Sequence, residues 1–512
     1  MDSPDEAHVR VVTVDRDGID PSTPYVTLSH CWGGTETMKL TSQNFDRYST
    51  GIPFSELPKL IADAVKITKN IGVRFLWVDK LCIIQDSDTD WRKEASLMEY
   101  VYGNGLCAIV ALDAPNDAES ILVAREPAQI EPFKLLFRSD PDGQSKTFYL
   151  YVKEVTKYDH PLIERGWCFQ EKLLSPRSIC FTRRQLHWEC RQTVASEMFP
   201  VQSYTILDDE TLNPKLMVTN PLEYIPIADL RGEYRMSSSD EEENIIDDGH
   251  KRIGNEPVYQ YFGPWGYLVA DYSKRKLTIE SDKLIAFSGI ARAMSVVVGE
   301  YLAGMWRCFL DCELLWEHGA LSGYSLTYRP AKYLAPSWSW ASLNGPVWYP
   351  LRYGKLDRLR VLWEIKEAQV ELVDSNPFGQ VCGGHLTIRA KVLASKWTKR
   401  PATKKDVSRE SLLEFDGKKR LIYHAAGLSS LVIRFDEEDV GLNPAPKDIF
   451  FLAALREEKG RFNGETNNIL GMVVGSADKS CHRYRRLGVF AIPAEIGDNA
   501  FRDCPEQTVV II

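Results

Sequence analysis

The segment Gly72-Val-Arg-Phe-Leu-Trp-Val-Asp79 decides the fold class of the N-terminal part of this chain. Its six central residues form a nearly continuous apolar run, which is typical of a strand buried on both faces of a parallel sheet. Asp79 closes the run and places a carboxylate at the end of that strand. From Leu60 to Gly72 the apolar side chains recur three and four residues apart, which predicts an amphipathic helix capped at Ser55-Glu-Leu-Pro58.

A second strand precedes this helix. Tyr25-Val-Thr-Leu-Ser29 alternates and is rich in β-branched residues, and it breaks into the loop His30-Cys-Trp-Gly-Gly34. A further short strand is expected at Val11–Val14. Together with the helix, the strands at Tyr25 and Val73 form a β-loop-α-β unit, in which the two strands are parallel.

The alternation of helix and strand continues downstream and predicts an α/β domain. A helix is expected over Trp91–Tyr102, with Asp88 or Asp90 as its cap, followed by a strand at Leu106–Leu112. The remaining elements expected in this domain are a strand at Thr147–Val152, a helix at Arg165–Leu174, and a hairpin through Ser178–Phe181 and Gln185–Glu189.

The rest of the chain divides by composition into three further regions. With 512 residues the chain exceeds what one hydrophobic core usually organises. We place the α/β domain at residues 1–200, an acidic linker at 201–255, a mostly helical extension at 256–345 and a β-rich domain at 346–512. The acidic, Ser-rich stretch Ser237–Glu243 is expected to be an exposed loop. Alternating apolar runs after residue 346 predict an antiparallel sandwich or a partial barrel, at Leu386–Leu393, Leu428–Phe435, Ile449–Leu455, Ile469–Val474, Leu487–Ile492 and Val509–Ile512.

Charge and cysteine usage exclude some classes of function. The 62 Lys and Arg against 71 Asp and Glu give a net charge of −9 without a basic run, which disfavours a nucleic-acid partner. No apolar stretch reaches membrane-spanning length and the N-terminus does not resemble a signal peptide, so we expect a cytoplasmic protein with no membrane span. The 11 Cys lack regular spacing, which indicates reduced thiols rather than a disulfide framework.

Two carboxylates are the leading candidates for chemistry. Asp79 and the loop Ser29–Gly33 each follow a strand, and residues beyond the carboxyl ends of parallel strands converge on one crevice. Glu171 lies in a third polar segment, Glu164–Glu171. A buried carboxylate there could transfer protons or stabilise an oxocarbenium-like state. Helix capping or an ion pair is the open structural alternative, with Arg165 or Arg74 as the partner, or with Arg165 or Lys172 for Glu171.

Other kinds of site have weaker sequence support. His30 and Cys31 are the residue types of a Cys/His hydrolase, but no nucleophile signature accompanies them, and Cys31 with Trp32 also suits a buried thiol and an aromatic anchor. Isolated His and Cys residues do not form a recognised zinc pattern, so no metal is expected; they are His187, Cys190, Cys308 and Cys312. Glycine-rich phosphate or dinucleotide loops are absent from the sequence.

Several ordered blocks of this sequence resemble the fungal heterokaryon incompatibility (HET) domain family over roughly residues 25–190. The blocks are Tyr25–Gly33, Leu57-Pro with Asp63-Ala, Gly72–Asp86, Asp90-Trp with Glu94, Met98 and Tyr102-Gly-Asn, Arg165–Arg177 and Trp188-Glu-Cys190. Two further stretches, Asp282–Arg292 and Ala335–Ala341, resemble the extension that often follows this domain. The sequence departs from the family at His30, where Tyr is common, and at Lys80, where a small polar residue is common. The resemblance implies a cytosolic protein of filamentous fungi, acting in non-self recognition and programmed cell death.

The HET domain is in turn similar to Toll/interleukin-1 receptor (TIR) domains. Trp167-Cys-Phe-Gln-Glu171 resembles the segment that carries the catalytic glutamate of the NAD-cleaving members. That similarity implies a mostly parallel sheet with flanking helices and Glu171 as the catalytic residue. It further implies NAD as substrate rather than a resident cofactor, in a pocket lined by Ser29, His30, Cys31, Trp32, Gly33, Asp79 and Trp167.

Two other functions stay open. One is a non-catalytic assembly module, for which a homo-oligomer or a protein partner in incompatibility signalling is expected. The other is a biosynthetic tailoring enzyme that reuses the fold, with an apolar pocket around Trp265, Trp306, Trp338 and Trp340. An NAD enzyme requires Glu171 to face an open cleft near Ser29–Gly33, whereas an assembly module could lock Glu171 into a buried ion pair.

Overall fold

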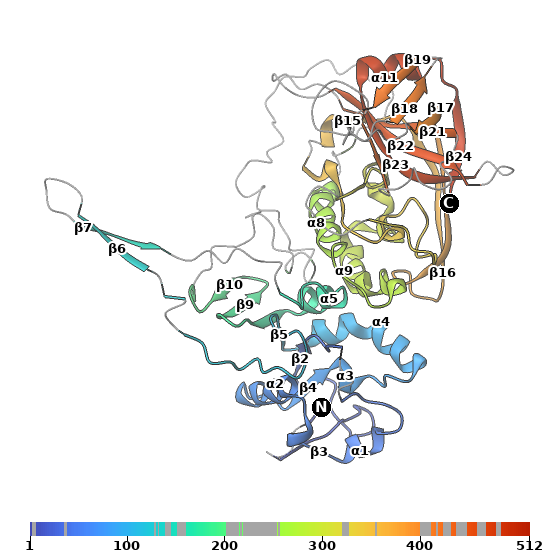
Figure 1. The fold of residues 1–512 in the computed structure, drawn as a ribbon. Helices are drawn as coiled ribbons and strands as arrows, with labels where there is room; N and C mark the ends of the chain where they lie inside the picture. Colours follow the sequence, from blue (N-terminus) through green and yellow to red (C-terminus); the bar gives the residue numbers. More distant parts are fainter. Residues whose placement is uncertain are drawn as a thin grey trace. The chain divides into compact units, whose positions relative to one another are not determined.

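The computed structural model comprises two compact units, Met1–Arg231 and Gly232–Ile512, which are described separately (Figure 1). The structure describes residues 1–2, 7–34, 38–126, 130–131, 133–138, 145–150, 160–200, 215, 218, 253, 257–319, 327–353, 356–399, 411–415, 418–422, 432–436, 448–457, 467–477 and 483–512. The predicted acidic loop Ser237–Glu243 and nearly all of the predicted linker 201–255 lie outside these residues.

The first unit is an α/β domain. Its strands are β1 His8–Val9, β2 Tyr25–Ser29, β3 Ile52–Pro53, β4 Phe75–Val78, β5 Cys107–Ala111, β6 Phe133–Arg138, β7 Ser145–Leu150, β8 Arg177–Phe181, β9 Leu186–Cys190 and β10 Val194–Ser196. Its helices are α1 Phe45–Thr50, the short 3-10 turn η1 Phe54–Glu56, α2 Lys59–Asn70, α3 Asp79–Cys82, α4 Asp88–Asn104 and α5 Trp167–Leu174.

The central sheet is mixed, with the order β10-β9-β8-β5-β2-β4. β4, β2, β5 and β8 are parallel neighbours, while β9 and β10 complete the sheet as antiparallel strands. Because β4 lies on one side of β2 and the later strand β5 on the other, the strand order reverses between β2 and β5. Ligand sites of open α/β sheets form at the carboxyl ends of strands next to such a reversal. The loop after Ser29 occupies this position.

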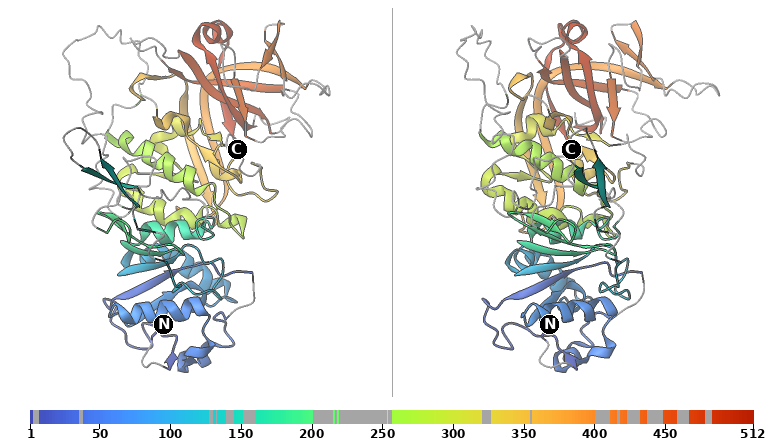
Figure 2. Two further views of the ribbon diagram at one scale, coloured as in Figure 1. Left: turned by 60° about the vertical axis from the view of Figure 1, so that its left-hand side comes forward. Right: turned by 90° about the vertical axis from the view of Figure 1, so that its left-hand side faces the viewer.

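Helices cover both faces of this sheet (Figure 2). Val26 and Leu28 of β2 pack with buried residues of α2 in the main apolar cluster. Successive side chains of a strand point to opposite faces, so Thr27 and Ser29 belong to the other face. On that face Cys168 of α5 joins an apolar cluster with residues of β5 and β8. The face that carries Ser29 therefore lies beneath α5.

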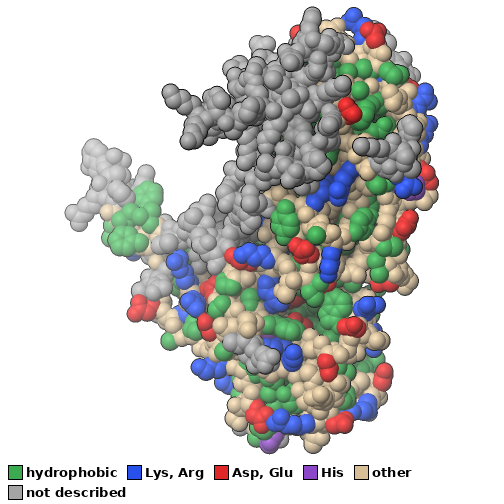
Figure 3. Space-filling view, turned by 45° about the vertical axis from the view of Figure 1, so that its right-hand side comes forward, with side chains coloured by type: hydrophobic (Ala, Val, Ile, Leu, Met, Phe, Trp, Pro, Cys, Tyr) green, Lys and Arg blue, Asp and Glu red, His purple; other side chains and the backbone are tan. Residues whose placement is uncertain are grey.

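The β6–β7 hairpin extends from this unit and exposes hydrophobic side chains. The exposed fractions of Phe133, Leu136 and Leu150 are 66%, 68% and 54%. These side chains gather in one visible patch on the hairpin (Figure 3). β7 confirms most of the strand predicted at Thr147–Val152, whose last two residues lie outside the described part of the chain.

Local predictions in the first unit hold with three exceptions. The opening strand is His8–Val9, which pairs with β3, because the chain turns after Val14; the strand predicted at Val11–Val14 is wrong. The cap of α4 is Ser87, whose hydroxyl accepts a hydrogen bond from the Asp90 backbone at 3.2 Å. The two aspartates predicted as caps lie inside the first helical turn instead. α2 begins after Pro58 without a side-chain cap.

The second unit begins with short helices around an aromatic core. They are η3 Pro257–Tyr261, α8 Phe262–Tyr272, η4 Glu280–Asp282, η5 Ile285–Phe287, α9 Ser288–Val298, η6 Arg307–Phe309, α10 Leu310–Glu313, η8 Trp340–Ser342, η9 Pro350–Tyr353 and η10 Leu356–Arg358. Short strand pairs interrupt them, namely β11 Tyr301–Leu302 with β12 Met305–Trp306 and β13 Glu317–His318 with β14 Val347–Trp348. The helical character predicted for residues 256–345 is therefore modest, because the half after Tyr301 is mostly turns and short strands.

A β-barrel forms the rest of the second unit. Its strands are β15 Leu359–Val361, β16 Glu364–Leu372, β17 Val381–Lys399, β18 Ser411–Phe415, β19 Lys418–Ile422, β20 Val432–Phe435, β21 Asp448–Glu457, β22 Asn468–Ser476, β23 Arg483–Pro493 and β24 Glu506–Ile511, with helix α11 Ala494–Phe501. The ring closes because the long strand β17 pairs with both β21 and β24. β21, β22 and β23 complete it, and only the short β23–β24 contact is parallel. The predicted antiparallel β region is thus a closed barrel.

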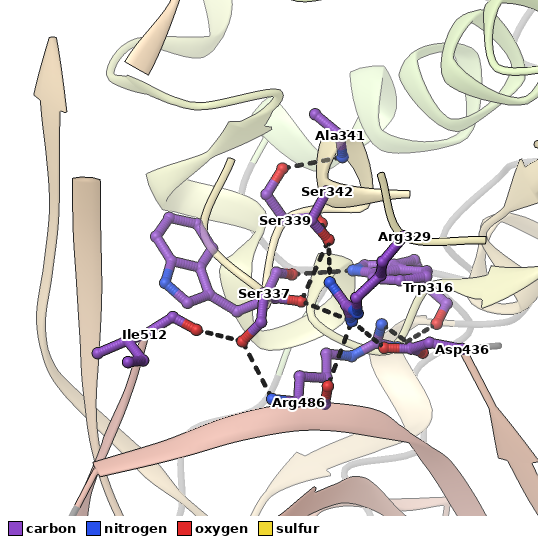
Figure 4. A network of polar contacts seen from close by, with 10 residues as sticks. Trp316, Arg329, Ser337, Ser339, Ala341, Ser342, Asp436, Arg486 and Ile512 are labelled. Carbon is purple, nitrogen blue, oxygen red and sulfur yellow. Dashed lines mark hydrogen bonds and ion pairs between the residues drawn. The ribbon is translucent and has the colours of Figure 1, made fainter. Parts of the chain in front are cut away.

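A buried ionic network ties the aromatic core to the barrel (Figure 4). Arg486 of β23 is fully buried, donates to Asp436 at 2.7 Å, and lies 3.4 Å from the ring centroid of Trp316. Arg329 donates to the other oxygen of Asp436 at 2.8 Å. Ser337 donates to the Ile512 carbonyl and accepts from the Arg486 backbone.

Candidate functional site

Trp32 and Asp79 meet at the carboxyl edge of the parallel strands. Asp79 is the first residue after β4, and Trp32 is the third residue after β2. The indole Nε1 of Trp32 donates to Asp79 Oδ2 at 2.9 Å, and the Lys80 backbone N–H donates to Asp79 Oδ1 at 2.7 Å. The predicted convergence of the two strand ends is therefore present. Asp79 keeps 17% of its side chain exposed, so this edge of the cluster reaches solvent.

Glu171 is a residue of α5, and its side chain faces the sheet surface that carries Ser29. Only 4% of Glu171 and none of Ser29 are exposed. The Ser29 hydroxyl lies close enough to lower the pKa of Glu171, although its geometry does not reach that of a full hydrogen bond. The hydroxyl of Tyr102, from α4, likewise lowers this pKa, and it also donates to the Leu28 carbonyl at 3.3 Å. The polar groups of Ser29, Tyr102 and Glu171 thus lie between α5 and the sheet, beside the apolar cluster that contains Cys168.

Burial and charge set the ionisation of the two carboxyl groups. Burial, together with the negative charge of Asp79, raises the pKa of Glu171 to about 7. Burial also raises the pKa of Asp79, while Arg165 and the hydrogen bond from Trp32 oppose this rise. Two close carboxylates disfavour simultaneous ionisation, and an adjacent cation favours it. Near neutral pH the pair can therefore hold or release a proton.

His30 and Arg165 complete the interior of the cluster. The Arg165 guanidinium donates to the His30 carbonyl, which fixes its charge beside the carboxylates. Burial, together with the charge of Arg165, lowers the pKa of His30 to about 3, so its imidazole is neutral. His30 is 2% exposed, its Nδ1 lies 3.9 Å from Asp79 Oδ1, and neither ring nitrogen has a hydrogen-bond partner. Buried polar atoms without partners are costly, which makes this ring a candidate contact for a ligand.

The segment that contains these residues was compared with known protein families. Residues 25–171 match the family model described as Heterokaryon incompatibility protein (HET). This segment is a HET domain. The matched range contains every candidate residue and ends at Glu171, whereas β8 and β9 lie beyond it. No curated protein and no solved structure matches the chain.

Lys80, where the sequence departs from the common pattern of the HET domain, contacts the ring of Trp32. Its Nζ donates to Asp117 Oδ2 at 2.6 Å, and both side chains are at most 3% exposed. The same ammonium lies 5.5 Å from the ring centroid of Trp32. Trp32 is therefore bound at its edge by Asp79 and across its ring by Lys80. Gly33 follows with φ +77°, and a Cβ there would lie 2.4 Å from Cβ of Asn116.

Two residues that were predicted to line the pocket, Cys31 and Trp167, pack against other side chains of the HET domain. Cys31 is 6% exposed and belongs to the apolar cluster of Cys168. Burial raises the pKa of its thiol, and with a neutral His30 the pair lacks the thiolate and imidazolium of a cysteine hydrolase. Trp167 packs edge-on against Trp91 of α4, with ring centroids 6.1 Å apart.

The predicted ion-pair alternatives hold only in part. Lys172 pairs with Glu189 at 2.7 Å, and Arg74 pairs with Asp2 at 2.7 Å, so neither occupies the candidate carboxylates. Arg165 does lower the pKa of both Asp79 and Glu171. Among the described residues, no group of three or more His, Cys, Asp and Glu could hold a metal ion. The described part of the chain also has no helix that is long and apolar enough to cross a membrane.

The indoles proposed to line a tailoring-enzyme pocket are core residues of the second unit. Trp265, Trp306, Trp338 and Trp340 are all fully buried. Trp265 and Trp306 pack against each other at 5.1 Å, and Trp340 packs against Tyr272 and Phe287. None of the four offers an exposed ring to a ligand in this conformation.

Three contributors to the HET-domain site were not assigned from the sequence. Tyr102 was predicted only as part of a helix face, and Arg165 only as an ion-pair partner. Asp117 carried no signal at all, because its partner Lys80 is 37 residues away and the intervening pattern is that of ordinary helix and strand. The unusual Lys80 was the one feature that could have prompted a search for a buried carboxylate.

Proposed function

We propose that this protein acts in heterokaryon incompatibility in a filamentous fungus, in the cytoplasm, and that its HET domain triggers cell death by hydrolysing NAD. The observation that carries the proposal is the meeting of Asp79, Glu171 and Arg165 next to the reversal in strand order. The similarity of Trp167–Glu171 to the catalytic segment of TIR domains supports the choice of NAD.

The reaction assigned to this site breaks one glycosidic bond. The bond between ribose C1′ and the nicotinamide nitrogen breaks, and its electron pair leaves with neutral nicotinamide. Ionised Glu171 stabilises the positive charge that develops on the ribose. Water then adds to C1′ and passes a proton to Asp79, which gives ADP-ribose, nicotinamide and a released proton. In this proposal Trp32 stacks on the nicotinamide ring, and Ser29 and His30 contact the ribose hydroxyls.

The burial of Glu171 adds a requirement to this mechanism. At 4% exposure Glu171 cannot meet a dinucleotide, so α5 must move away from the sheet before substrate enters. The movement would separate the polar groups of Ser29, Tyr102 and Glu171, and also the apolar contacts of Cys168 with the sheet, so it has a cost that binding energy must offset. We propose that homo-oligomerisation or a protein partner supplies this opening.

The test is nicotinamide release by the full chain over a concentration series. Glu171→Gln is expected to abolish product formation while leaving the circular dichroism spectrum unchanged. Glu56→Gln, at an exposed glutamate paired with Arg47, is the matched control and is expected to keep full activity. The wild-type rate is expected to rise between pH 6 and 8, since a pKa of about 7 makes Glu171 progressively ionised over that range.

A non-catalytic assembly module is the second candidate, and the enclosure of Glu171 favours it. Under this alternative the wild type and Glu171→Gln are equally inert at every concentration, while sedimentation velocity reveals concentration-dependent assembly. Nicotinamide release that depends on Glu171 excludes it.

A further inference from the structure

A buried lysine from beyond the HET match holds the carboxyl end of α5. Lys215 belongs to the first unit, follows the matched range 25–171 in the chain, and is 4% exposed. Its Nζ donates to the carbonyls of Lys172 and Ser175 at 2.5 and 2.6 Å, and to Ser178 Oγ at 3.1 Å. Lys172 belongs to α5, Ser175 is the C-cap of that helix, and Ser178 belongs to β8. One ammonium group therefore joins the helix to the sheet.

The carboxyl end of α5 requires partners of this kind. The last carbonyl groups of a helix lack partners within the helix, and a nearby cation interacts favourably with the helix dipole. In α5 the Ser175 hydroxyl donates to the Glu171 carbonyl at 2.8 Å, while Lys215 donates to the carbonyls of Lys172 and Ser175. Burial lowers the pKa of Lys215 to about 8, and the charge of Glu189 opposes this fall. The ammonium form thus predominates at pH 7.

The contact with Lys215 lies at the turn of α5 that carries Glu171. Because Lys172 is the next residue, a movement that lifts the Glu171 side chain away from Ser29 at this end of the helix must break the bonds from Lys215 to the helix or to Ser178. A lysine that leaves the protein is strongly hydrated, and the freed carbonyls of a helix end bond to water. The contact can therefore break and form again, since its groups have partners in both states.

We propose that Lys215 is a positioning residue that latches α5 over the sheet, and that withdrawal of its ammonium group opens the way to Glu171. A second copy of the chain or a protein partner that binds the withdrawn form more tightly shifts the equilibrium toward open α5. The inference rests on the function proposed for the HET domain where it invokes NAD. The latch itself is a property of the fold and is measured without NAD.

The first test is hydrogen exchange of the full chain carrying Lys215→Met, which keeps an unbranched apolar side chain and removes the ammonium group. Amides at residues 169–175 are expected to exchange about tenfold faster, which corresponds to about 1.4 kcal/mol, while β2 and β5 keep their wild-type rates. Ser178→Ala removes only the partner on the sheet and is expected to give a smaller acceleration in the same segment. Lys66→Met, at an exposed lysine of α2, is the matched control and is expected to leave α5 unchanged.

The second test separates a latch from a residue that only supports the structure. Lys215→Met is expected to release nicotinamide at protein concentrations about tenfold lower than the wild type requires, because less binding energy is then needed to open α5. Removing a merely structural contact would lower the rate of nicotinamide release instead.

Three results overturn the proposal. They are unchanged exchange of α5 in Lys215→Met, an acceleration that is equal in α5, β2 and β5, and faster exchange of α5 with less nicotinamide release than an active wild type. If Lys215→Met does not fold, Ser178→Ala is judged by the same criteria. If wild type and variant are both inert toward NAD while α5 alone exchanges faster, the latch stands and the function proposed for the HET domain fails.

Discussion

Glu171 in the first unit and Glu313 in the second are both buried carboxyl groups on short helices, but their surroundings differ. Glu313 is fully buried, accepts a hydrogen bond from the Trp306 backbone at 2.5 Å, and has uncharged Trp265 and Tyr349 beside it. Burial raises its pKa well above the ordinary value, and the neighbouring Trp306 backbone N–H, Trp265 and Tyr349 oppose this rise. Glu171 instead lies between the charges of Asp79 and Arg165.

The comparison separates two uses of a buried acid. Burial shifts the pKa of Glu313 upward, which favours its protonated form, and the side chain is a polar member of an aromatic core. Glu171 has a pKa of about 7, so small changes in its surroundings alter its charge. Groups whose pKa lies near neutrality are candidates for proton transfer. The two acids thus differ in the charged groups around them rather than in their burial.

The largest expected effect comes from disrupting a buried ion pair of the second unit. Asp436→Asn leaves Arg486 and Arg329 buried without their shared carboxylate (Figure 4). Removing one partner of a buried ion pair is expected to lower the free energy of unfolding by about 4–5 kcal/mol. Denaturant unfolding followed by hydrogen exchange in the barrel strands measures the change.

The control for this variant is an exposed pair of the same unit. Asp498→Asn breaks the Arg456–Asp498 pair, whose side chains are 28% and 45% exposed, and is expected to cost less than about 1 kcal/mol. Equal effects of the two variants would mean that the Arg486 network contributes no more than a surface ion pair.

A second prediction concerns the fixed polar pair of the first unit. Lys80→Met leaves Asp117 buried without its ammonium partner and is expected to lower the free energy of unfolding by about 3–4 kcal/mol. Lys66→Met, at an exposed lysine that pairs with Asp63, should cost less than about 0.5 kcal/mol. The double variant Lys80→Met/Asp117→Leu should recover most of the loss, because replacing both charges by apolar groups is often neutral. A double variant as unstable as Lys80→Met would contradict this account.

The Lys80–Asp117 pair also marks the limit of what the sequence could predict. Local patterns placed Ser29 and Asp79 at strand ends, since a buried strand and its polar terminus are encoded within a few residues. The pairing of Lys80 with Asp117 and the burial of Glu171 depend on how distant elements pack, which periodicity does not encode. Short elements were least predictable: the apolar run at Val11–Val14 lies beside the strand rather than in it, because pairing with Ile52–Pro53 selects His8–Val9.

The third prediction compares the two acids directly through pH. An unfolded glutamate ionises near pH 4.5, whereas folded Glu171 ionises near 7, so the folded state binds more protons between these values. The stability of the first unit should therefore fall by about 3 kcal/mol from pH 4.5 to 7 and then level off, since each unit of pKa difference is worth about 1.4 kcal/mol. Glu171→Gln should remove this fall.

The variant Glu313→Gln tests the same pH dependence for the buried acid of the second unit. The pKa of Glu313 is also raised, so the free energy of unfolding of the second unit should fall as the pH rises above 4.5, and Glu313→Gln should remove that fall. Unfolding free energies of both variants and the wild type at pH 5, 7 and 9, assigned to each unit by hydrogen exchange, test this. A fall that persists in the first unit of Glu171→Gln, or in the second unit of Glu313→Gln, would contradict the burial of these acids as its cause.

The smallest expected effect tests how rigidly the Trp32 loop is held beside Asp79. Gly33 has φ +77°, a region that residues with a Cβ rarely adopt, and an added Cβ would lie 2.4 Å from Cβ of Asn116. Gly33→Ala is therefore expected to lower the free energy of unfolding by about 1–2 kcal/mol and to displace the loop. At the neighbouring Gly34 an added Cβ would meet no atom within 4 Å, and φ lies outside the left-handed region, so Gly34→Ala should change stability by less than about 0.5 kcal/mol.

The two alanine variants also separate stability from the placement of Trp32. If the loop positions the indole against Asp79, Gly33→Ala should weaken the Trp32–Asp79 hydrogen bond, and the signal of the Trp32 indole N–H in an NMR spectrum should shift. Gly34→Ala should leave that signal in place. Equal spectra for both variants would mean that Asp79 and Lys80 alone hold Trp32, because the ring would then keep its position when the backbone beneath it changes.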